Sequence, residues 1–232
     1  MKVMILAGGQ GTRLAEYTHK VPKPMVEIGD KPMLGHIVDI FRRQAMNNFV
    51  IAAGYKKEMI EKWAAEQDFN IRVVDTGQDT LTGGRIKRAG KFMGIGPFIM
   101  TYGDGVADIN ITHVWNYHTT FKPLVTLTAV RPPARFGSLR LDGAGKVLGF
   151  HEKSQTAEGW VNGGFMIIEN EVLDMIEGDD TNFERDVLPQ IAEDRKLQAY
   201  FHTGFWQCMD TIRDVELLRQ LYDEGAPWIK RS

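Results

Sequence analysis

The stretch VMILAGGQGTRL at residues 3–14 decides the start of the fold. It begins with a short apolar run, and three glycines then occur within four positions, at Gly8, Gly9 and Gly11. A short apolar run that ends in a glycine cluster is typical of a buried strand leading into a loop. Because glycine has no Cβ atom, the backbone N–H groups of such a loop can come close to a bound anion. The stretch therefore predicts a strand followed by an anion-binding loop.

The residues around this loop do not complete either of two common phosphate motifs. No Gly-Lys-Ser/Thr closes the loop as in a Walker A motif, and the third glycine and the later acidic residue of the dinucleotide-binding fingerprint are missing. Arg13 does offer a fork of donors suited to phosphate oxygens. On the glycines alone, an ordinary tight turn is as good an interpretation as an anion site.

Lys23 favours the anion site. It lies ten residues after Arg13, between Pro22 and Pro24. The two prolines fix φ on either side and disfavour a helix, so we expect the lysine on a stiff, non-helical segment. A rigidly held ammonium group close after a glycine-rich loop is a natural phosphate ligand.

Apolar runs alternate with helical patterns through the first half of the chain. The runs at residues 49–53, 70–74 and 98–102 predict buried strands, and the patterns at residues 33–41, 55–67 and 84–91 predict helices. Repeated β-α units with almost continuous apolar strands imply a mostly parallel sheet that helices cover on both faces.

The second half has more closely spaced strand patterns. The runs at residues 124–130, 137–141 and 147–150, with a turn signal at Asp142-Gly143, predict antiparallel pairing. Further strands are expected at residues 160–168 and 197–201, and helices at residues 171–176, 183–191 and 210–224. The predicted fold class is α/β: one domain, residues 1–232, with a Rossmann-like, mostly parallel mixed sheet flanked by helices and a small antiparallel extension.

Composition limits the kinds of partner. The 232 residues carry a net charge of −2, which gives no reason to expect nucleic acid or an anionic membrane surface. The single cysteine suits a reducing compartment, and the first apolar run is too short for a signal peptide. We therefore expect a cytoplasmic protein that has no targeting segment and no membrane span.

Two aspartates are candidate ligands of a cation. Asp104 follows the apolar run at residues 98–102 and lies between two glycines, at the strand end where ligands of open α/β sheets bind. An oxygen ligand at that edge suits Mg²⁺, although an Asp-Gly turn explains the same residues equally well. Asp210 directly precedes a helical pattern, and from that pattern alone a helix N-cap is the favoured interpretation.

Taken together, Gly-x-Gly-Thr-Arg at residues 9–13 and Lys-Pro-Met at residues 23–25 resemble the signature of the sugar-1-phosphate nucleotidyltransferases. The stretch from Trp206 to Thr211 resembles the segment that supplies the second metal-binding aspartate in that family. The resemblance implies that Arg13, Lys23 and Asp104 are catalytic. It also implies Mg²⁺ as the cofactor, with Asp104 and Asp210 as its ligands.

The resemblance also assigns residues to the two substrates. Glu152-Lys153 is similar to the Glu-Lys-Pro motif of the family, with Ser154 in place of the proline, and Lys153 is expected to hold the sugar phosphate. The implied sugar-phosphate-binding residues are Glu152, Lys153, Asn162, Gly163 and Trp206. The implied nucleotide-binding residues are Leu6, Ala7, Gly8, Gly9, Gly11, Thr12, Arg13, Lys23, Thr82, Gly83, Arg85, Tyr102 and Gly103.

Within the family, three stretches look like the glucose-1-phosphate cytidylyltransferases: Asp-Thr-Gly at residues 75–77, Thr-Gly-Gly-Arg at residues 82–85 and Arg-Phe-Gly at residues 135–137. This likeness implies transfer of a cytidylyl group from CTP to glucose 1-phosphate, giving CDP-glucose and pyrophosphate. It implies a nucleotide-binding half at residues 1–110, a sugar-phosphate-binding half at residues 111–232, and a homo-oligomer. Two alternatives stay open: another base or acceptor, such as GTP or UTP with a heptose phosphate or other phosphate ester, or a non-catalytic sugar-nucleotide sensor.

Overall fold

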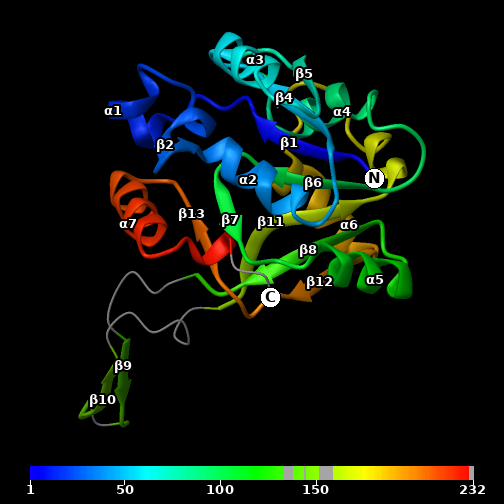
Figure 1. Ribbon diagram of the computed structural model, residues 1–232. Helices are drawn as coiled ribbons and strands as arrows, with labels where there is room; N and C mark the ends of the chain where they lie inside the picture. The colour runs from blue at the N-terminus through cyan, green and yellow to red at the C-terminus, as the bar shows by residue number, and fades with distance from the viewer. Residues whose placement is uncertain (133–137, 144, 152–158, 230–232) are drawn as a thin grey trace.

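The computed structural model describes residues 1–132, 138–143, 145–151 and 159–229 (Figure 1). Its centre is a seven-stranded sheet with the strand order β12-β8-β11-β6-β1-β4-β5. The strands are β1 (Val3–Ala7), β4 (Asn48–Ala53), β5 (Asn70–Asp75), β6 (Phe98–Tyr102), β8 (Val125–Val130), β11 (Val161–Ile168) and β12 (Leu197–Phe201). Neighbouring strands from β6 through β1 and β4 to β5 are parallel, and so are β8 and β12. Strand β11 runs antiparallel to both β6 and β8, so the predicted mostly parallel mixed sheet is confirmed.

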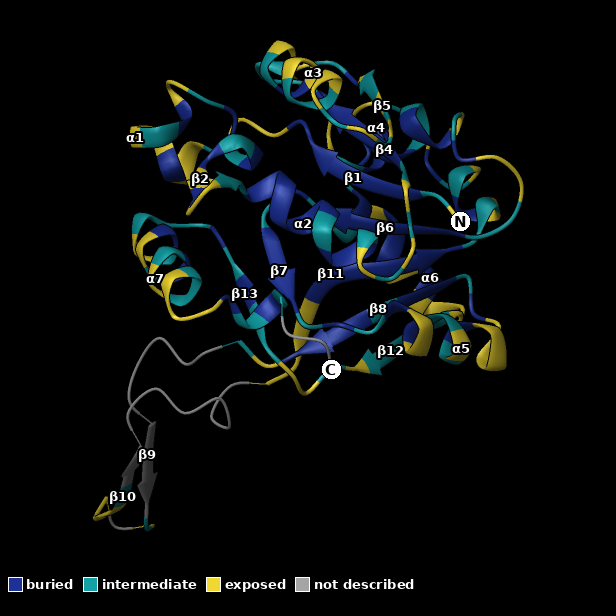
Figure 2. Ribbon diagram, in the orientation of Figure 1, coloured by how far each residue is buried: buried dark blue, intermediate teal, exposed yellow. Residues whose placement is uncertain are grey.

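Helices cover both faces of this sheet because side chains of β1 alternate between two buried clusters. Val3, Ile5 and Ala7 pack into one cluster, and Met4 and Leu6 into the other. The helices are α1 (Ala15–Thr18), α2 (Met33–Arg42), α3 (Lys57–Ala65), α4 (Thr82–Gly90), α5 (Ile111–Phe121), α6 (Leu188–Glu193) and α7 (Ile212–Asp223). The first cluster takes side chains from α2 and α7, and the second from α4 and α6. Figure 2 shows the result: a buried sheet between helices whose outer faces are exposed.

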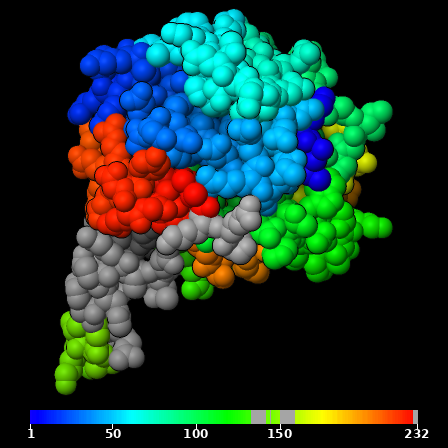
Figure 3. All heavy atoms as spheres, in the orientation of Figure 1, coloured from blue at the N-terminus to red at the C-terminus, as the bar shows by residue number. Residues whose placement is uncertain are grey.

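Short strands add three two-stranded ladders. These are β2 (Glu27–Ile28) with β3 (Lys31–Pro32), β7 (Gly105–Ala107) with β13 (Trp206–Cys208), and β9 (Ser138–Leu141) with β10 (Val147–His151). The β9–β10 pair is the predicted antiparallel extension, and it projects from the body of the molecule (Figure 3). The strand expected at residues 124–130 does not join it, because β8 pairs instead with β11 and β12 in the main sheet.

Two expected helices take other forms. The helix expected at residues 171–176 is a single 3₁₀ turn, Asn170–Leu173. The helix expected at residues 183–191 begins as a π-helix, Phe183–Val187, and continues as α6, in which Pro189 occupies the first turn. Proline is tolerated there because the first N–H groups of a helix need no intrahelical partner. Within the part of the chain that the structure describes, no helix combines the length and the apolar character needed to cross a membrane.

Candidate active site

The candidate site lies where β1 and β6 end side by side. These strands are parallel, with Leu6 opposite Tyr102, so the glycine loop and Asp104 leave the sheet at the same edge. The N–H of Gly103 donates to the carbonyl oxygen of Leu6 at 2.8 Å, so the two segments are hydrogen-bonded to each other where they leave the sheet. A cleft of about 420 Å³ opens between them.

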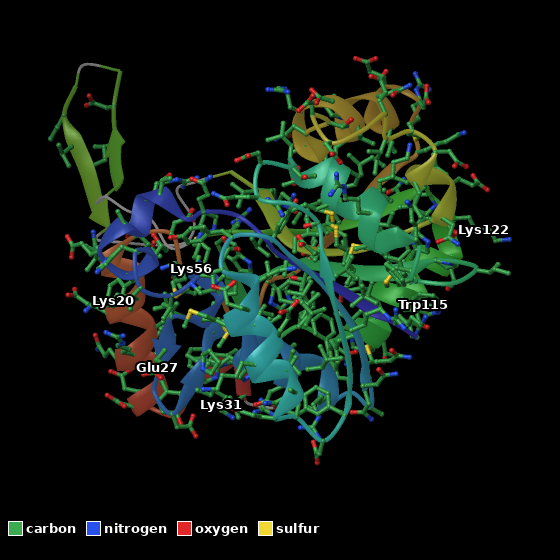
Figure 4. All side chains as sticks on the ribbon, turned by 90° about the horizontal axis from the view of Figure 1, so that it is seen from above. Lys20, Glu27, Lys31, Lys56, Trp115 and Lys122 are labelled. Carbon is green, nitrogen blue, oxygen red and sulfur yellow. The ribbon has the colours of Figure 1, made fainter. Side chains whose placement is uncertain are left out.

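The glycine loop is held by hydrogen bonds to two of its carbonyl oxygens. The carbonyl oxygen of Gly8 accepts from the N–H of Tyr55 at 3.2 Å, and that of Gly11 accepts from the Thr18 hydroxyl, also at 3.2 Å. Gly11 has φ +64°, and a Cβ there would lie 2.9 Å from the Thr18 methyl carbon. Lys56, which Figure 4 labels beside Lys20, donates to the carbonyl oxygen of Thr18 at 3.3 Å. The loop is therefore a preformed concave backbone segment.

Lys23 lines the cleft and lies between two carboxylates. Its Nζ lies 2.6 Å from Asp104 Oδ2 and 2.6 Å from Asp210 Oδ1. Burial lowers the pKa of the Lys23 ammonium, but the two carboxylates raise it by more, so its pKa lies above the usual value. The non-helical segment expected here is wrong in detail, since residues 23–25 form one 3₁₀ turn with Pro22 as its extended N-cap. Pro24 fits because its missing N–H falls in the first turn.

Asp210 reaches Asp104 through tertiary pairing. Strands β7 and β13 pair antiparallel with Cys208 opposite Gly105, and the N–H of Met209 donates to the carbonyl oxygen of Asp104 at 2.8 Å. Arg13 Nη1 also contacts Asp210, at 3.0 Å from Oδ2, although its side chain is 75% exposed. Two cationic and two anionic side chains therefore lie in contact in the lining of the cleft.

The N-cap interpretation of Asp210 is wrong. The N-cap of α7 is Thr211, whose hydroxyl accepts from the N–H of Asp214 while the Asp214 carboxylate accepts from the N–H of Thr211, which is a capping box. Because Thr211 caps the helix, the Asp210 carboxylate is directed to the cations of the cleft instead.

The donor set of the two aspartates fits a hard divalent cation. One oxygen of each aspartate contacts the Lys23 ammonium, and carboxylate oxygens are the ligands that Mg²⁺ prefers. Among the described residues there is no group of three or more His, Cys, Asp and Glu placed to hold a metal. Two carboxylates match the usual Mg²⁺ arrangement, in which substrate phosphates and water complete the coordination.

Most of the expected nucleotide-binding residues line this one cleft. They are Leu6, Ala7, Gly8, Gly9, Gly11, Thr12, Arg13, Lys23, Thr82, Arg85, Tyr102 and Gly103. Gly83 is placed elsewhere: its N–H donates to the carbonyl oxygen of Thr181 at 2.9 Å, and an added Cβ would lie 2.7 Å from that oxygen.

Arg85 lines the cleft but is committed to the protein. Its side chain donates to the Thr76 hydroxyl at 2.7 Å and to the carbonyl oxygens of Gly77 and Gln78 at 2.7 and 3.0 Å. Burial lowers the pKa of this guanidinium, and only 5% of the residue is exposed. A Cβ on Gly8 would lie 2.0 Å from Arg85 Nη1. Arg85 therefore acts as a strut that packs against the glycine loop and holds the 76–78 loop.

A second cavity of about 530 Å³ adjoins the first. It contains Asn162, Gly163 and Trp206, three of the residues expected to bind the sugar phosphate. The Trp206 indole N–H donates to the carbonyl oxygen of Gly163 at 2.8 Å, which fixes the ring against the glycine segment. The two cavities share Arg13, Thr82, Tyr102, Asp104 and Asp210, so they form one continuous site.

Some predicted residues lie outside the described part of the chain. These are Glu152 and Lys153, with Ser154, and the stretch at residues 135–137. Glu184 also lines the second cavity, although the sequence did not predict it as a site residue. No local motif marks Glu184, because its hydrogen-bond partners, Thr82 and Tyr102, lie 102 and 82 positions away in the chain.

The chain is similar to known proteins in sequence and in structure. Residues 2–217 match the family described as "Nucleotidyl transferase". The chain is 40% identical to glucose-1-phosphate cytidylyltransferase of Salmonella typhi, over 98% of each chain. It is 35% identical to a probable glucose-1-phosphate cytidylyltransferase of Bacillus subtilis, over 97% of each. In structure it resembles HddC from Yersinia pseudotuberculosis with a TM-score of 0.75 and 24% identity, over 95% of this chain and 99% of that one, which supports the fold. The chain therefore belongs to the nucleotidyl transferase family, among the sugar-1-phosphate nucleotidyltransferases.

Proposed function

We propose that this enzyme transfers a cytidylyl group from CTP to glucose 1-phosphate and releases pyrophosphate and CDP-glucose. The observation that carries the proposal is the meeting of Lys23 and Arg13 with Asp104 and Asp210 beside the glycine loop. The base and the sugar rest on the two relatives that share 40% and 35% identity over almost the whole chain. Within one domain, residues 1–110 bind mainly the nucleotide and residues 111–232 mainly the sugar phosphate.

In the proposed reaction, a phosphate oxygen of the sugar 1-phosphate attacks the α-phosphorus of CTP in line. The bond from the α-phosphorus to the bridging oxygen of the β-phosphate breaks, and pyrophosphate leaves with the electron pair. Because the attacking oxygen is already an anion, the protein needs no nucleophile and no strong base. The work of the protein is alignment and charge neutralisation.

The side chains of the cleft have distinct parts in this proposal. The glycine loop and Arg13 bind the β- and γ-phosphates, and Lys23 binds the α-phosphate. Asp104 and Asp210 would hold Mg²⁺, which when bound neutralises charge on the phosphates. A well-placed hydrogen-bond donor, such as Lys23 or Arg13, stabilises the transition state by about 3–4 kcal/mol. Lys153 is proposed to hold the acceptor phosphate.

Lys23 has to change partners for this to happen. In this structure the Lys23 ammonium lies between the two carboxylates at 2.6 Å from each. The α-phosphate of the nucleotide offers it a new anionic partner, which releases the carboxylates for the cation. We therefore propose that nucleotide and metal enter together.

The test is pyrophosphate release on mixing the protein with CTP, Mg²⁺ and glucose 1-phosphate. The Asp104→Asn variant is expected to fold normally and to lose turnover, because it keeps the shape of the side chain but not its charge. Full activity in that variant would contradict the metal assignment. Removal of Mg²⁺ by EDTA is expected to stop the reaction of the wild-type protein.

A second candidate keeps the reaction class and changes the substrates. The chain is also 30% identical, over 96% of its length, to a probable mannose-1-phosphate guanylyltransferase of Oryza sativa, whose own length is matched over 64%. GTP or UTP with a heptose phosphate or another phosphate ester is therefore an alternative pair. Assaying the common nucleoside triphosphates against glucose 1-phosphate, then CTP against other sugar phosphates, separates these cases. A non-catalytic sensor would bind the nucleotide and release no pyrophosphate in any combination.

The assembly and the compartment are part of the proposal. Two exposed aromatic rings, Trp160 and Phe201, pack edge to face with their centroids 4.7 Å apart at the end of the sheet. An exposed apolar pair of this kind supports the expected homo-oligomer, which light scattering after gel filtration would test. The single cysteine, Cys208, supports a reducing cytoplasm.

A further inference from the structure

Glu184 lies between the two halves of the candidate site. It belongs to the π-helix Phe183–Val187 and lines the 530 Å³ cavity that contains Asn162, Gly163 and Trp206. Its Oε2 accepts a hydrogen bond from the Thr82 hydroxyl at 2.6 Å, and its Oε1 accepts one from the Tyr102 hydroxyl. Both partners also line the cleft that we assign to the nucleotide.

The hydrogens of these two hydroxyls are committed to Glu184. The Thr82 oxygen accepts from the backbone N–H of Phe183 at 2.9 Å, so its single hydrogen is left to point at the carboxylate. Burial raises the pKa of Tyr102 well above its usual value, and the Glu184 carboxylate raises it further, so this hydroxyl stays protonated and donates. The Tyr102 hydroxyl also interacts with Asn162.

The ring of Tyr102 is fixed as well. Gly164 has φ +86°, and a Cβ there would lie 2.7 Å from Tyr102 Cδ2, so only a glycine lets the ring lie this close. The Asn162 side chain is held in turn, because its Oδ1 accepts from the N–H of Gly164 at 2.9 Å. One rigid polar chain therefore runs from Thr82 through Glu184 and Tyr102 to Asn162.

The π-helix places this carboxylate. Phe183 and Val187 point into the buried cluster beneath the sheet, and Asn182 caps the turn by accepting from the N–H of Arg185 at 2.8 Å. The turn thus anchors its apolar residues in the core while Glu184 lines the cavity. π-helical turns are rare overall, but those that occur are often found at functional sites.

We propose that Glu184 is a specificity-determining residue for the acceptor, whose carboxylate accepts a hydrogen bond from a hydroxyl group of the sugar. A carboxylate has about four acceptor positions, and Thr82 and Tyr102 occupy two of them. Glu184 itself lines the cavity that contains Asn162, so we assign its remaining acceptor positions to the sugar. A fixed negative charge there selects neutral, hydroxyl-bearing sugars and repels acidic ones.

This inference rests on the proposed function, and the experiment keeps the two apart. Turnover of the wild-type protein with CTP and glucose 1-phosphate tests the proposed function and is measured first. If another acceptor from the substrate screen is used instead, the Glu184 experiment is carried out on that acceptor. The variants are Glu184→Ala and Glu184→Gln, and the matched control is Glu193→Ala, which changes an exposed glutamate on α6.

The readout is the ratio of kcat/KM for the acceptor to kcat/KM for each of its monodeoxy analogues. In the wild-type protein, kcat/KM for one analogue is expected to be lower than kcat/KM for the acceptor by on the order of tenfold to a hundredfold. This is the loss expected for a hydrogen bond to a charged group. Glu184→Ala is expected to lower kcat/KM for the intact acceptor by a similar factor and to abolish that discrimination, with the KM for CTP almost unchanged. Glu184→Gln keeps the shape and is expected to show an intermediate ratio.

A purely structural role would look different. Loss of a purely structural residue would lower the melting temperature and weaken the binding of both substrates. The ratio of kcat/KM for the acceptor to kcat/KM for each deoxy analogue would stay at the wild-type value. That result in a folded Glu184→Ala protein overturns the proposal. If Glu184→Ala does not fold, an unchanged ratio in Glu184→Gln overturns it equally. Loss of discrimination in the Glu193→Ala control would also overturn it, because the effect would then not belong to Glu184.

Discussion

Replacing Lys23 by methionine is expected to give the substrate-free protein a tighter site for a divalent cation. In the wild-type protein the Lys23 ammonium lies 2.6 Å from both Asp104 and Asp210, where it competes with any added cation. Methionine keeps an unbranched side chain of similar length and removes the charge. The variant therefore leaves two carboxylates facing each other with no ammonium between them.

The magnitude follows from the geometry. Two oxygens that each lie 2.6 Å from one nitrogen are at most about 5 Å apart. At an effective dielectric constant of about 20, two negative charges at that distance repel by about 3 kcal/mol. The Asp104 and Asp210 side chains are 33% and 25% exposed, so solvent reduces this to about 1–2 kcal/mol. A bound cation relieves this repulsion, and the gain corresponds to roughly tenfold tighter binding.

Two assays measure this gain in cation affinity without enzymatic turnover. Electron paramagnetic resonance of free Mn²⁺ gives the dissociation constant of the protein without substrates, and thermal unfolding with and without MnCl₂ gives the linked stabilisation. Lys23→Met is expected to melt below the wild-type protein in EDTA and to recover more than the wild-type protein does when Mn²⁺ is added. Lys20→Met, which removes an exposed lysine from the same segment, is the matched control.

Unchanged Mn²⁺ affinity would refute this reasoning. If Lys23→Met binds Mn²⁺ no more tightly than Lys20→Met and the wild-type protein, Lys23 does not compete for the carboxylates. Equal shifts of the melting temperature in all three proteins would have the same meaning.

Three further predictions concern stability and reactivity. Gly8→Ala is expected to destabilise the fold by about 1–3 kcal/mol in denaturant titrations, because its Cβ would lie 2.0 Å from the buried, hydrogen-bonded Arg85 guanidinium. Gly9→Ala, where an added Cβ meets nothing within 4 Å, should leave stability almost unchanged, and equal losses would contradict the strut role of Arg85. Burial raises the pKa of Cys208 to about 12, so at pH 8 iodoacetamide should alkylate the native protein far more slowly than the urea-unfolded protein; mass spectrometry decides this, and equal rates would be inconsistent with it. The partners of Lys23 raise its pKa, so their stabilisation is complete below the unfolded value of 10.5 and is lost as the pH rises through the folded pKa. The wild-type protein should therefore lose more stability than Lys23→Met between pH 10 and pH 12, and parallel profiles would count against the two ion pairs.

Some features of the site are marked by short stretches of sequence. Apolar runs followed by glycine placed the ends of β1 and β6, and the parallel pairing of these strands brings both loops to one edge. Prolines on either side of Lys23 marked a stiff segment, although it forms a 3₁₀ turn. These signals work because strand periodicity and restricted φ values depend on a few neighbouring residues.

Other features had misleading local signals. The position of Asp210 before a helix favoured an N-cap, yet Thr211 and Asp214 form the capping box. The close spacing of strands favoured a partner for β8 in the hairpin, yet β8 lies in the main sheet. In both cases local patterns permit two outcomes, and the packing of distant segments selects one.

The sequence by itself therefore determined the α/β class, the glycine loop and the cationic residues near it, because backbone restrictions and apolar periodicity are local properties. Only the tertiary structure brought Asp210 to Asp104 and Lys23, buried Arg85 as a strut and joined Glu184 to Thr82 and Tyr102. Lys23 and Asp210 are 187 positions apart, and Glu184 and Thr82 are 102 apart. Contacts over such separations form when the sheet and its helices pack, and no short stretch of sequence specifies them.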